Sequence, residues 1–270
     1  EERVRPNFAV GLTEETPATS KIWVMSHLDV VPPGEPDGEG GWKGWQGDPW
    51  TLRVENGKVY GRGVEDDQGG IVPSIFALLA LREVGHTPPL PVRLLFVSDE
   101  ETGSRFGLDH VLAVERAAFS EEDLIVVPDA GDEDGTMIEV AEKSILWLRF
   151  TLTGKQCHAS MPQLGVNACR VAAHLTVRLD ELNTRYSGVD PLFDPPRSTF
   201  EPTLRPANVP NVNAAPGRDV FCFDCRILPD VDVDGVLEWV RRTCRDIESE
   251  HGVKVDVEII QRQNAAEATP

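Results

Sequence analysis

The sequence has few positive charges, few lysines in particular, and no long apolar run. Its 6 lysines and 20 arginines stand against 45 acidic residues, which gives a net charge of -19. Nucleic acid is excluded as a partner, because phosphate binding needs clustered Lys and Arg and the basic residues here are scattered. No apolar run reaches the roughly 18 residues of a membrane span, so we expect a soluble protein without a membrane partner.

Cysteine is also scarce. The five cysteines are an odd number, without the paired framework of a small secreted domain. The opening EERVRPNFAV has neither the basic nor the apolar region of a signal peptide. Both features favour a cytoplasmic location. Because Glu1 is not a start methionine, we expect residues to be missing upstream.

The first half of the chain alternates short apolar runs with helical stretches. KIWVMSHLDVV, VRLLFVSDE and LIVVPDA read as strands, and residues from about Gln68 to Val84 as a helix. This alternation indicates an α/β fold with a mainly parallel sheet and helices on both faces. Between them, TLRVENGKVYGRG predicts a hairpin around Asn56-Gly57. Chemistry is expected where the strands of such a sheet end.

From about Ser144 the order of elements changes. ILWLRFTLTG reads as a strand, Ala168 to Leu182 as a helix, DVFCFDCRI as a strand, Val236 to Glu250 as a helix, and VKVDVEII as a strand. The first of these helices has apolar residues at i, i+3 and i+4, which is typical of one buried face. The pattern predicts a compact α+β domain of βαββαβ type.

Polar residues follow four strand-like runs of the first half, where apolar strands would not otherwise tolerate them. They are His27 with Asp29, Asp66, Glu100 with Glu101, and Asp129. Burying an unpaired charge costs several kcal/mol, so such groups usually pair or bind metal. One histidine and several carboxylates at the strand ends of one sheet are what a hard or borderline divalent metal pair requires.

Each group taken alone also has an ordinary structural explanation. His27 and Asp29 lie on one face of a strand, and Asp29 then simply fixes the tautomer of a core histidine. The acids around Asp66 would cap the following helix. Glu100 with Glu101 would lie in a solvated loop and Asp129 in a turn. Neighbouring glutamates with different tasks, one binding metal and one moving protons, explain the acidic run equally well. The structural explanations weaken when all four groups are taken together.

A family resemblance makes the metal hypothesis specific. SHLDVVPPG, DPW, GRGVEDDQGG, FVSDEETGS and VPDAG resemble, in order, the signatures of the M20 metallopeptidases, which include aminoacylases, desuccinylases, deacetylases and dipeptidases. The resemblance implies a zinc-peptidase-like catalytic domain with two divalent metal ions, zinc first and cobalt or manganese as alternatives. The implied metal ligands are His27, Asp66 (bridging both ions), Glu101 and Asp129. Glu100 is then the general base, and Asp29 orients His27.

The second half carries two further motifs of this family. GKQCHAS with GVNA resembles the histidine motif of its lid domain, and NAAP with DCR resembles its substrate-carboxylate motif. The resemblance implies that His158 acts on the substrate from a partner subunit, and that Asn213 and Arg226 hold a carboxylate. Without it, His158 would be an exposed or helix-adjacent histidine and Arg226 a charge at a strand edge.

The resemblance also implies the domain organisation. Residues 1–143 would form the metal-binding catalytic domain, residues 144–264 a lid and dimerisation domain, and residues 265–270 would begin the return to the catalytic domain. The family completes its second metal site with a histidine in a C-terminal segment that this sequence does not reach. We therefore expect these 270 residues to be inactive as a fragment and the whole protein to be a homodimer.

The expected function is hydrolysis of the amide bond of an N-acyl amino acid or dipeptide with a free carboxylate, possible substrates including succinyl-diaminopimelate. One alternative is a two-zinc aminopeptidase of a related fold, which would lack the inserted domain with His158 and Asn213. Another alternative is a non-catalytic scaffold that retains the fold. The intact set of upstream ligands and the base Glu100 argue against the scaffold.

Overall fold

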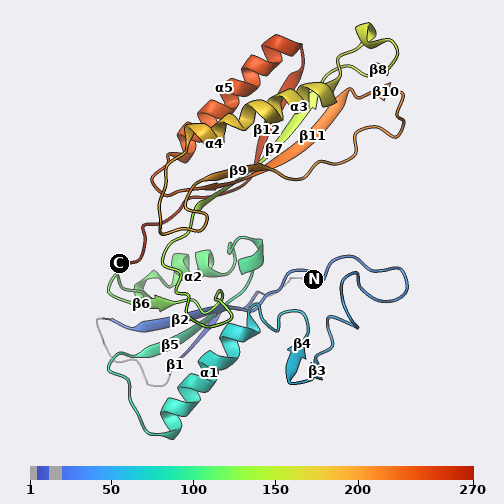
Figure 1. Ribbon diagram of the computed structural model, residues 1–270. Helices are drawn as coiled ribbons and strands as arrows, with labels where there is room; N and C mark the ends of the chain where they lie inside the picture. Colours follow the sequence, from blue (N-terminus) through green and yellow to red (C-terminus); the bar gives the residue numbers. More distant parts are fainter. Residues whose placement is uncertain (1–4, 12–19) are drawn as a thin grey trace. The chain divides into compact units, whose positions relative to one another are not determined.

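The computed structural model describes residues 5–11 and 20–270, and the chain divides into two compact units, residues 1–138 and 139–270 (Figure 1). The division lies a few residues before Ser144, where the first strand of the second unit begins. Among the described residues, no helix is long and apolar enough to cross a membrane.

A four-stranded sheet forms the centre of the first unit, in the order β1-β5-β2-β6. Its strands are β1 Phe8–Gly11, β5 Val92–Val97, β2 Ile22–His27 and β6 Leu124–Val126. Strand β2 runs parallel to β5 and β6, whereas β1 pairs antiparallel with β5. The sheet is therefore mixed, and the expectation of a mainly parallel sheet needs this correction. Strand β1 was not predicted from the sequence, because it has only four residues and three of them are exposed.

Helices cover both faces of this sheet. The helix α1, Gln68–Glu83, packs Ile71 and Leu78 against Leu94 and Phe96. On the other face, Val111 of α2, Leu108–Val114, packs with alternate residues of the same strands. This two-sided packing follows from the side chains of β5, which point alternately to opposite faces. The short helices η1, Glu100–Thr102, and η2, Arg116–Ala118, flank α2 in the chain.

The hairpin lies where the sequence places it. Strands β3, Arg53–Glu55, and β4, Lys58–Tyr60, pair antiparallel around Asn56 and Gly57. The φ angles of these two residues are 51° and 76°, the left-handed values that a type I′ turn requires. The prediction of this hairpin is confirmed, and the chain runs from β4 through residues 61–67 directly into α1.

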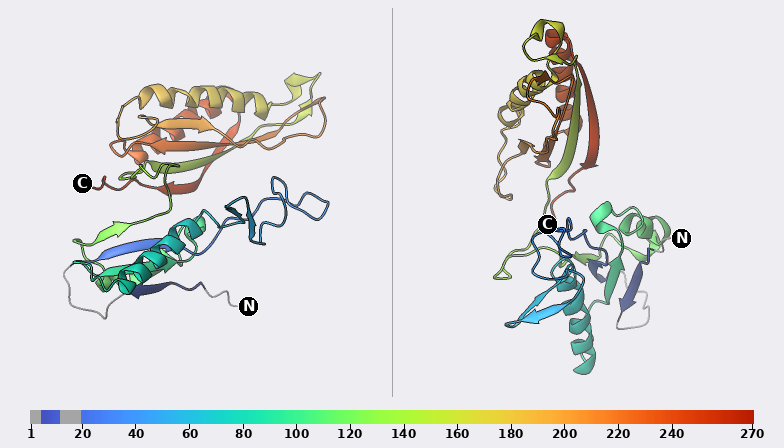
Figure 2. Two further views of the ribbon diagram at one scale, coloured as in Figure 1. Left: turned by 60° about the horizontal axis from the view of Figure 1, so that its bottom comes forward. Right: turned by 90° about the vertical axis from the view of Figure 1, so that its right-hand side faces the viewer.

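An antiparallel sheet forms the second unit, in the order β12-β7-β11-β9. Its strands are β7 Ser144–Thr153, β9 Thr199–Pro202, β11 Arg218–Ile227 and β12 Lys254–Gln263. Helices α3, Ala168–Leu179, and α5, Val233–His251, lie on one side of this sheet (Figure 2). The main elements thus follow each other as strand, helix, strand, strand, helix, strand.

Two helix boundaries differ from the sequence-based expectation. The helix expected to reach Leu182 ends at Leu179, and a separate short helix, α4 Glu181–Arg185, follows. The last helix begins at Val233, because the side chain of Asp232 accepts a hydrogen bond from Asp234 N and caps it. Three small elements complete the unit: β8 Cys157–His158, η3 Pro162–Leu164 and β10 Ala214–Ala215.

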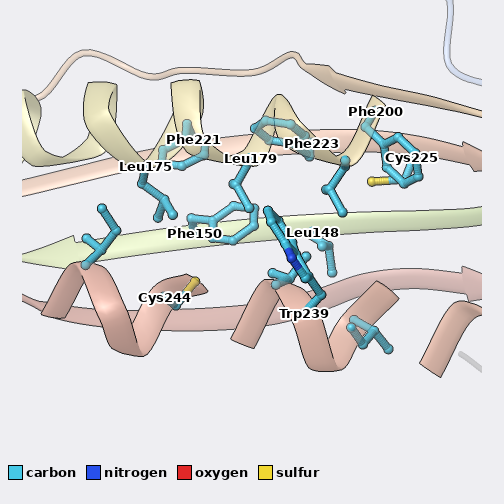
Figure 3. Close-up of a cluster of buried hydrophobic side chains, with 14 of the residues drawn as sticks. Leu148, Phe150, Leu175, Leu179, Phe200, Phe221, Phe223, Cys225, Trp239 and Cys244 are labelled. Carbon is cyan, nitrogen blue, oxygen red and sulfur yellow. The ribbon is translucent and has the colours of Figure 1, made fainter. Parts of the chain in front are cut away.

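The core of the second unit is one continuous cluster between the sheet and the two helices (Figure 3). Phe150 of β7 stacks on Phe221 of β11 with ring centroids 4.8 Å apart, and Phe223 meets the same ring edge-on. The cysteines Cys225 and Cys244 are buried in this cluster. Burial raises the pKa of each thiol to about 12.

Candidate metal centre

The candidate metal centre lies at the end of strand β2, around the buried side chain of His27. Its Nδ1 lies 2.9 Å from the backbone carbonyl oxygen of Asp29, so Nδ1 carries the proton and donates. Its Nε2 lies 2.8 Å from Asp66 Oδ1 and 3.8 Å from Asp129 Oδ2. In a neutral imidazole, Nε2 then directs a lone pair at two carboxylates, an arrangement that requires a cation or a proton between them.

Asp29 contacts the His27 imidazole, but mainly through its backbone oxygen. Its carboxylate Oδ1 is 3.5 Å from His27 Nδ1, and the closer acceptor is its own backbone oxygen. The two carboxylate oxygens instead accept the backbone N–H groups of Glu100, at 3.0 Å, and Glu101, at 3.2 Å. Asp29 thus fixes the imidazole through its main chain and the two glutamates through its side chain.

The short helix η1 presents Glu100 and Glu101 directly after strand β5. Glu101 Oε1 accepts a hydrogen bond from Val31 N at 3.1 Å. Ligand atoms of Glu101, His27 and Asp66 all lie within 4.8 Å of one another. The structure therefore brings residues from three distant parts of the sequence together.

Asp67 belongs to a second group of this kind, with His27 and Asp129. Its Oδ2 accepts a hydrogen bond from His27 N at 2.9 Å, and its Oδ1 accepts one from Gly70 N at 3.2 Å. Asp67 is therefore the cap of helix α1 and fastens the end of β2. The cap explanation holds for Asp67, whereas Asp66 lies beside the imidazole, where metal binding stays a prediction. An acid three residues before Gly70 was the available signal for the cap.

Several acidic side chains lie close together in this site, and their proximity shifts the pKa values of its residues. Burial raises the pKa of Glu100, and the charges of Asp129 and Glu101 raise it further. Burial likewise raises the pKa of Asp129, together with the charges of Asp67 and Asp66. Burial lowers the pKa of His27, but Asp129 and the other acids outweigh it and leave this pKa raised.

The donor set fits a divalent metal. It combines one imidazole nitrogen with a directed lone pair and three carboxylates, those of Asp66, Glu101 and Asp129. This combination is typical of zinc and of related borderline or hard cations. A bound cation would also relieve the repulsion that raises the pKa of Glu100 and Asp129.

In the second unit, the structure brings His158 and Asn213 together. Strands β8 and β10 pair, and Ala159 N donates to the backbone oxygen of Asn213 at 2.8 Å. The Asn213 Nδ2 atom lies 3.5 Å from His158 Nε2. His158 Nδ1 lies 2.7 Å from Ser160 Oγ. Both side chains are exposed at one end of the sheet.

Arg226 lies at the other end of strand β11. Eight residues of extended chain separate Arg218, next to β10, from Arg226, which corresponds to about 25 Å. Within one chain, Arg226 and Asn213 are therefore too far apart to contact the same small carboxylate. That both hold a substrate carboxylate stays a prediction. Arg226 makes a bidentate contact with Asp224, at 2.8 and 3.2 Å. It lines a cavity of about 340 Å³ together with Lys143 and other residues.

Comparison with known proteins agrees with this geometry. An uncharacterized metallohydrolase of Methanococcus maripaludis is 39% identical over 261 residues, which are 91% of this chain and 61% of the relative. A succinyl-diaminopimelate desuccinylase of Alkalilimnicola ehrlichii is 31% identical over 217 residues, 79% of this chain and 55% of the relative. The chain thus spans less than two thirds of the length of these relatives.

Solved structures show the same fold. An M20 family metallo-carboxypeptidase from Sulfolobus solfataricus superimposes with a TM-score of 0.69 at 17% identity, covering 97% of this chain and 68% of that chain. The sequence profile of Peptidase family M20/M25/M40 matches residues 23–269 of this chain. With the convergence of His27 and its carboxylates, this match shows that the chain belongs to peptidase family M20/M25/M40, a family of metallohydrolases.

Proposed function

We propose that this chain carries the metal ligands and the general base of an amidohydrolase. The substrate would be an N-acyl amino acid or a dipeptide with a free carboxylate. The observation that carries this proposal is the position of His27 Nε2, which lies near Asp66 and Asp129, together with the grouping of Glu101 with His27 and Asp66. The similarity to a desuccinylase supports including a succinyl-diaminopimelate-like substrate in the proposal.

The ligands divide between two ions. His27, Asp66 and Asp129 would hold one ion, and Asp66 with Glu101 the other. When bound, two divalent cations, zinc first and cobalt or manganese as alternatives, would polarise the scissile carbonyl and lower the pKa of water. His27 Nε2 serves a single ion, so among the described residues the second position has carboxylates alone. We propose that this second position binds its ion more weakly than the first.

Glu100 is the proposed general base. The backbone N–H of Glu100 donates to the Asp29 carboxylate, and Val31 N donates to the side chain of Glu101. These contacts hold the backbone of Glu100 and leave its carboxylate to act on the substrate. It would take a proton from the attacking water and deliver it to the nitrogen of the leaving amine.

The second unit would supply the substrate contacts from two copies of the chain. Arg226 lies near the C-terminal end of β11, whereas His158 and Asn213 lie at β8 and β10, beyond its N-terminal end. A single second unit therefore does not present all three side chains to one small substrate. We therefore propose a homodimer in which Arg226 of one copy holds the substrate carboxylate. His158 and Asn213 of the other copy would stabilise the developing oxyanion. The Asp224 contact uses Nε and Nη2 of Arg226, so a carboxylate would approach Nη1.

The test of the base is the pair of variants Glu100→Gln and Glu101→Gln. The full-length enzyme would be assayed on N-acetyl and N-succinyl amino acids and dipeptides, with zinc, cobalt or manganese. Glu100→Gln should lower turnover by at least about a thousandfold with unchanged metal content. Glu101→Gln should lower metal content, and Glu65→Gln, an exposed neighbour, is the matched control. Metal loss in the first variant would reverse the two roles, and a wild type without turnover would favour the scaffold.

The test of the shared site is subunit mixing. His158→Ala and Glu100→Gln homodimers should each be inactive. Subunits exchanged between the two should recover part of the activity, because one mixed site contains both wild-type residues. No recovery after demonstrated exchange would place His158 in its own subunit's site. A two-zinc aminopeptidase would instead cleave peptides with a free amino group, and His158→Ala would leave its turnover unchanged.

A further inference from the structure

The acidic run after strand β5 contains a third acid, Asp99, to which neither metal binding nor proton transfer gives a role. It directly precedes Glu100, yet its side chain is only 3% exposed. Its backbone adopts the left-handed conformation, with φ 57° and ψ 30°. A buried carboxylate in an uncommon backbone conformation, next to the proposed base, requires partners.

Those partners are Arg5 and Phe106. Arg5 Nη1 lies 3.1 Å from Asp99 Oδ2. Phe106 N lies 3.2 and 3.1 Å from the two carboxylate oxygens of Asp99 and donates to them. The backbone oxygen of Asp99 also accepts from Ser104 N at 2.8 Å and from Thr102 N at 3.2 Å. Asp99 thus closes the turn that contains Glu100 and Glu101.

Asn7 and Arg5 hold both ends of this turn from outside. Asn7 Oδ1 accepts from Ser98 N at 2.9 Å, and Asn7 Nδ2 donates to Phe106 O at 2.8 Å. The Arg5 guanidinium lies 5.1 Å from the centroid of the Phe106 ring. The two ends approach so closely that a Cβ at position 107 would overlap the backbone oxygen of Ser98.

We propose that Asp99, Arg5 and Asn7 form a clamp that positions Glu100 and Glu101 for metal binding and proton transfer. The clamp holds the turn through Asp99 on one side, and Asp29 holds the backbone N–H groups of both glutamates on the other. A partly buried ion pair adds little to stability compared with an apolar pair, so geometry is its main contribution. The role in catalysis rests on the proposed function. Asp99 acts through its neighbours and is a positioning residue.

The experiment compares Asp99→Asn and Arg5→Met in the full-length protein, with Co²⁺ as the probe. Each variant should weaken the binding of Co²⁺ through Glu101 by about tenfold or more and alter its absorption spectrum, as loss of an outer partner of a ligand typically does. The value of kcat should fall by a similar factor while KM stays within about twofold. The effect of the double variant should be smaller than the sum of the two single effects, because both substitutions remove the Arg5–Asp99 ion pair.

Matched controls separate the clamp from local packing. Arg105 lies over the same Phe106 ring, at 5.3 Å, and Arg105→Met removes a cation–π contact without touching Asp99. Asp109→Asn removes an exposed acid from the first turn of α2. Both controls should bind Co²⁺ as the wild type does. If Asp99→Asn lowers the unfolding temperature but leaves Co²⁺ affinity and spectrum unchanged, the role is structural and the clamp is refuted.

Amide hydrogen exchange tests the clamp independently of activity. The amides of Glu100 and Glu101 should exchange at least about tenfold faster in Asp99→Asn than in the wild type or in Asp109→Asn. Unchanged exchange in both clamp variants would overturn the inference. A wild type that binds no Co²⁺ would refute the proposed function instead, while the exchange rates would still decide whether the clamp exists.

Discussion

The two units of this chain differ in the size and continuity of their hydrophobic cores. In the second unit, one continuous cluster fills the space between the sheet and helices α3 and α5. In the first unit, two small clusters lie on opposite faces of the sheet. Yet the candidate metal ligands all lie in the first unit. The unit with the larger hydrophobic core is therefore the one without the candidate metal ligands.

Contiguous exposed apolar residues lie on two elements of the first unit. On helix α1, Val72, Ile75, Phe76 and Leu79 are exposed at the spacing i, i+3, i+4, i+7. Edge strand β6 exposes Leu124, Ile125 and Val126. A helical stripe of this spacing is typical of a face that packs against another element, and contiguous exposed apolar surface marks interaction sites. The first unit therefore carries a contiguous apolar stripe on α1 and an apolar strand at β6, although the second unit also exposes single apolar residues such as Val177 and Val212.

The largest expected effect is on independent folding. Residues 139–270 expressed alone should unfold cooperatively in urea, because their core involves no residue of the first unit. Residues 1–138 alone should bind a hydrophobic dye more strongly and should unfold at lower urea, over a broader range. Circular dichroism and dye fluorescence would measure both. An equally sharp transition at similar urea in the first fragment would remove the contrast between the two units.

Matched core substitutions should give the next largest effect. Leu148, 1% exposed within the continuous cluster, should lose about 3–5 kcal/mol of unfolding free energy on substitution to alanine. Leu78, 7% exposed in a small cluster of the first unit, should lose about 2 kcal/mol on the same substitution. Urea unfolding monitored separately for each unit would show the difference. Equal losses would mean that the two cores are equally well packed.

Metal addition should stabilise only the first unit. At a free Co²⁺ concentration about 100 times Kd, linkage stabilises the binding unit by about 2.7 kcal/mol. Differential scanning calorimetry should therefore show one transition moving upward and the transition of residues 139–270 staying in place. A shift of both transitions would show that the units unfold together.

The unfolding free energy of the metal-free first unit should fall as pH rises. The pKa values of Glu100, Asp129 and His27 are raised, so the folded state binds protons more tightly than the unfolded state. Stability from the two carboxyl groups is present at low pH and is lost as pH rises above their ordinary pKa values near 4. For His27 the loss occurs above pH 6.5, through its raised pKa. Bound metal should abolish this trend.

The smallest expected effect is that of an exposed residue. Phe76 is 65% exposed on α1, so Phe76→Ser should change the unfolding free energy by about 0.5 kcal/mol or less. The same change should reduce self-association in light scattering, because it interrupts the apolar stripe. A loss above about 2 kcal/mol would show that this face already packs against other residues of the chain.

Local features were predictable from the sequence where neighbouring residues determine them. The Asn56-Gly57 turn follows from backbone preferences, and the polar residues after β2 and β5 follow from the contrast with their apolar strands. These are short-range signals. Hydrophobic pattern likewise located β7 and β11.

Long-range pairing was not predictable in the same way. Strand β1 has too few residues to show a pattern, and its place beside β5 depends on tertiary contacts. Which oxygen of Asp29 meets His27 depends on a turn that the period of two does not describe, since β2 ends at His27. The distance between Asn213 and Arg226 could have been predicted from the sequence, because a long strand-like run lies between the two residues.

The burial of the thiols gives the molecule a built-in chemical selectivity. Cys225 and Cys244, with pKa values of about 12, hold almost no thiolate at neutral pH, and Cys222 is buried. Only the thiolate attacks an alkylating reagent. Cys157, next to His158, and Cys169 in α3 are partly exposed. A maleimide dye added to the native protein should therefore label these two positions, which makes fluorescence at the His158 end accessible without removing any cysteine.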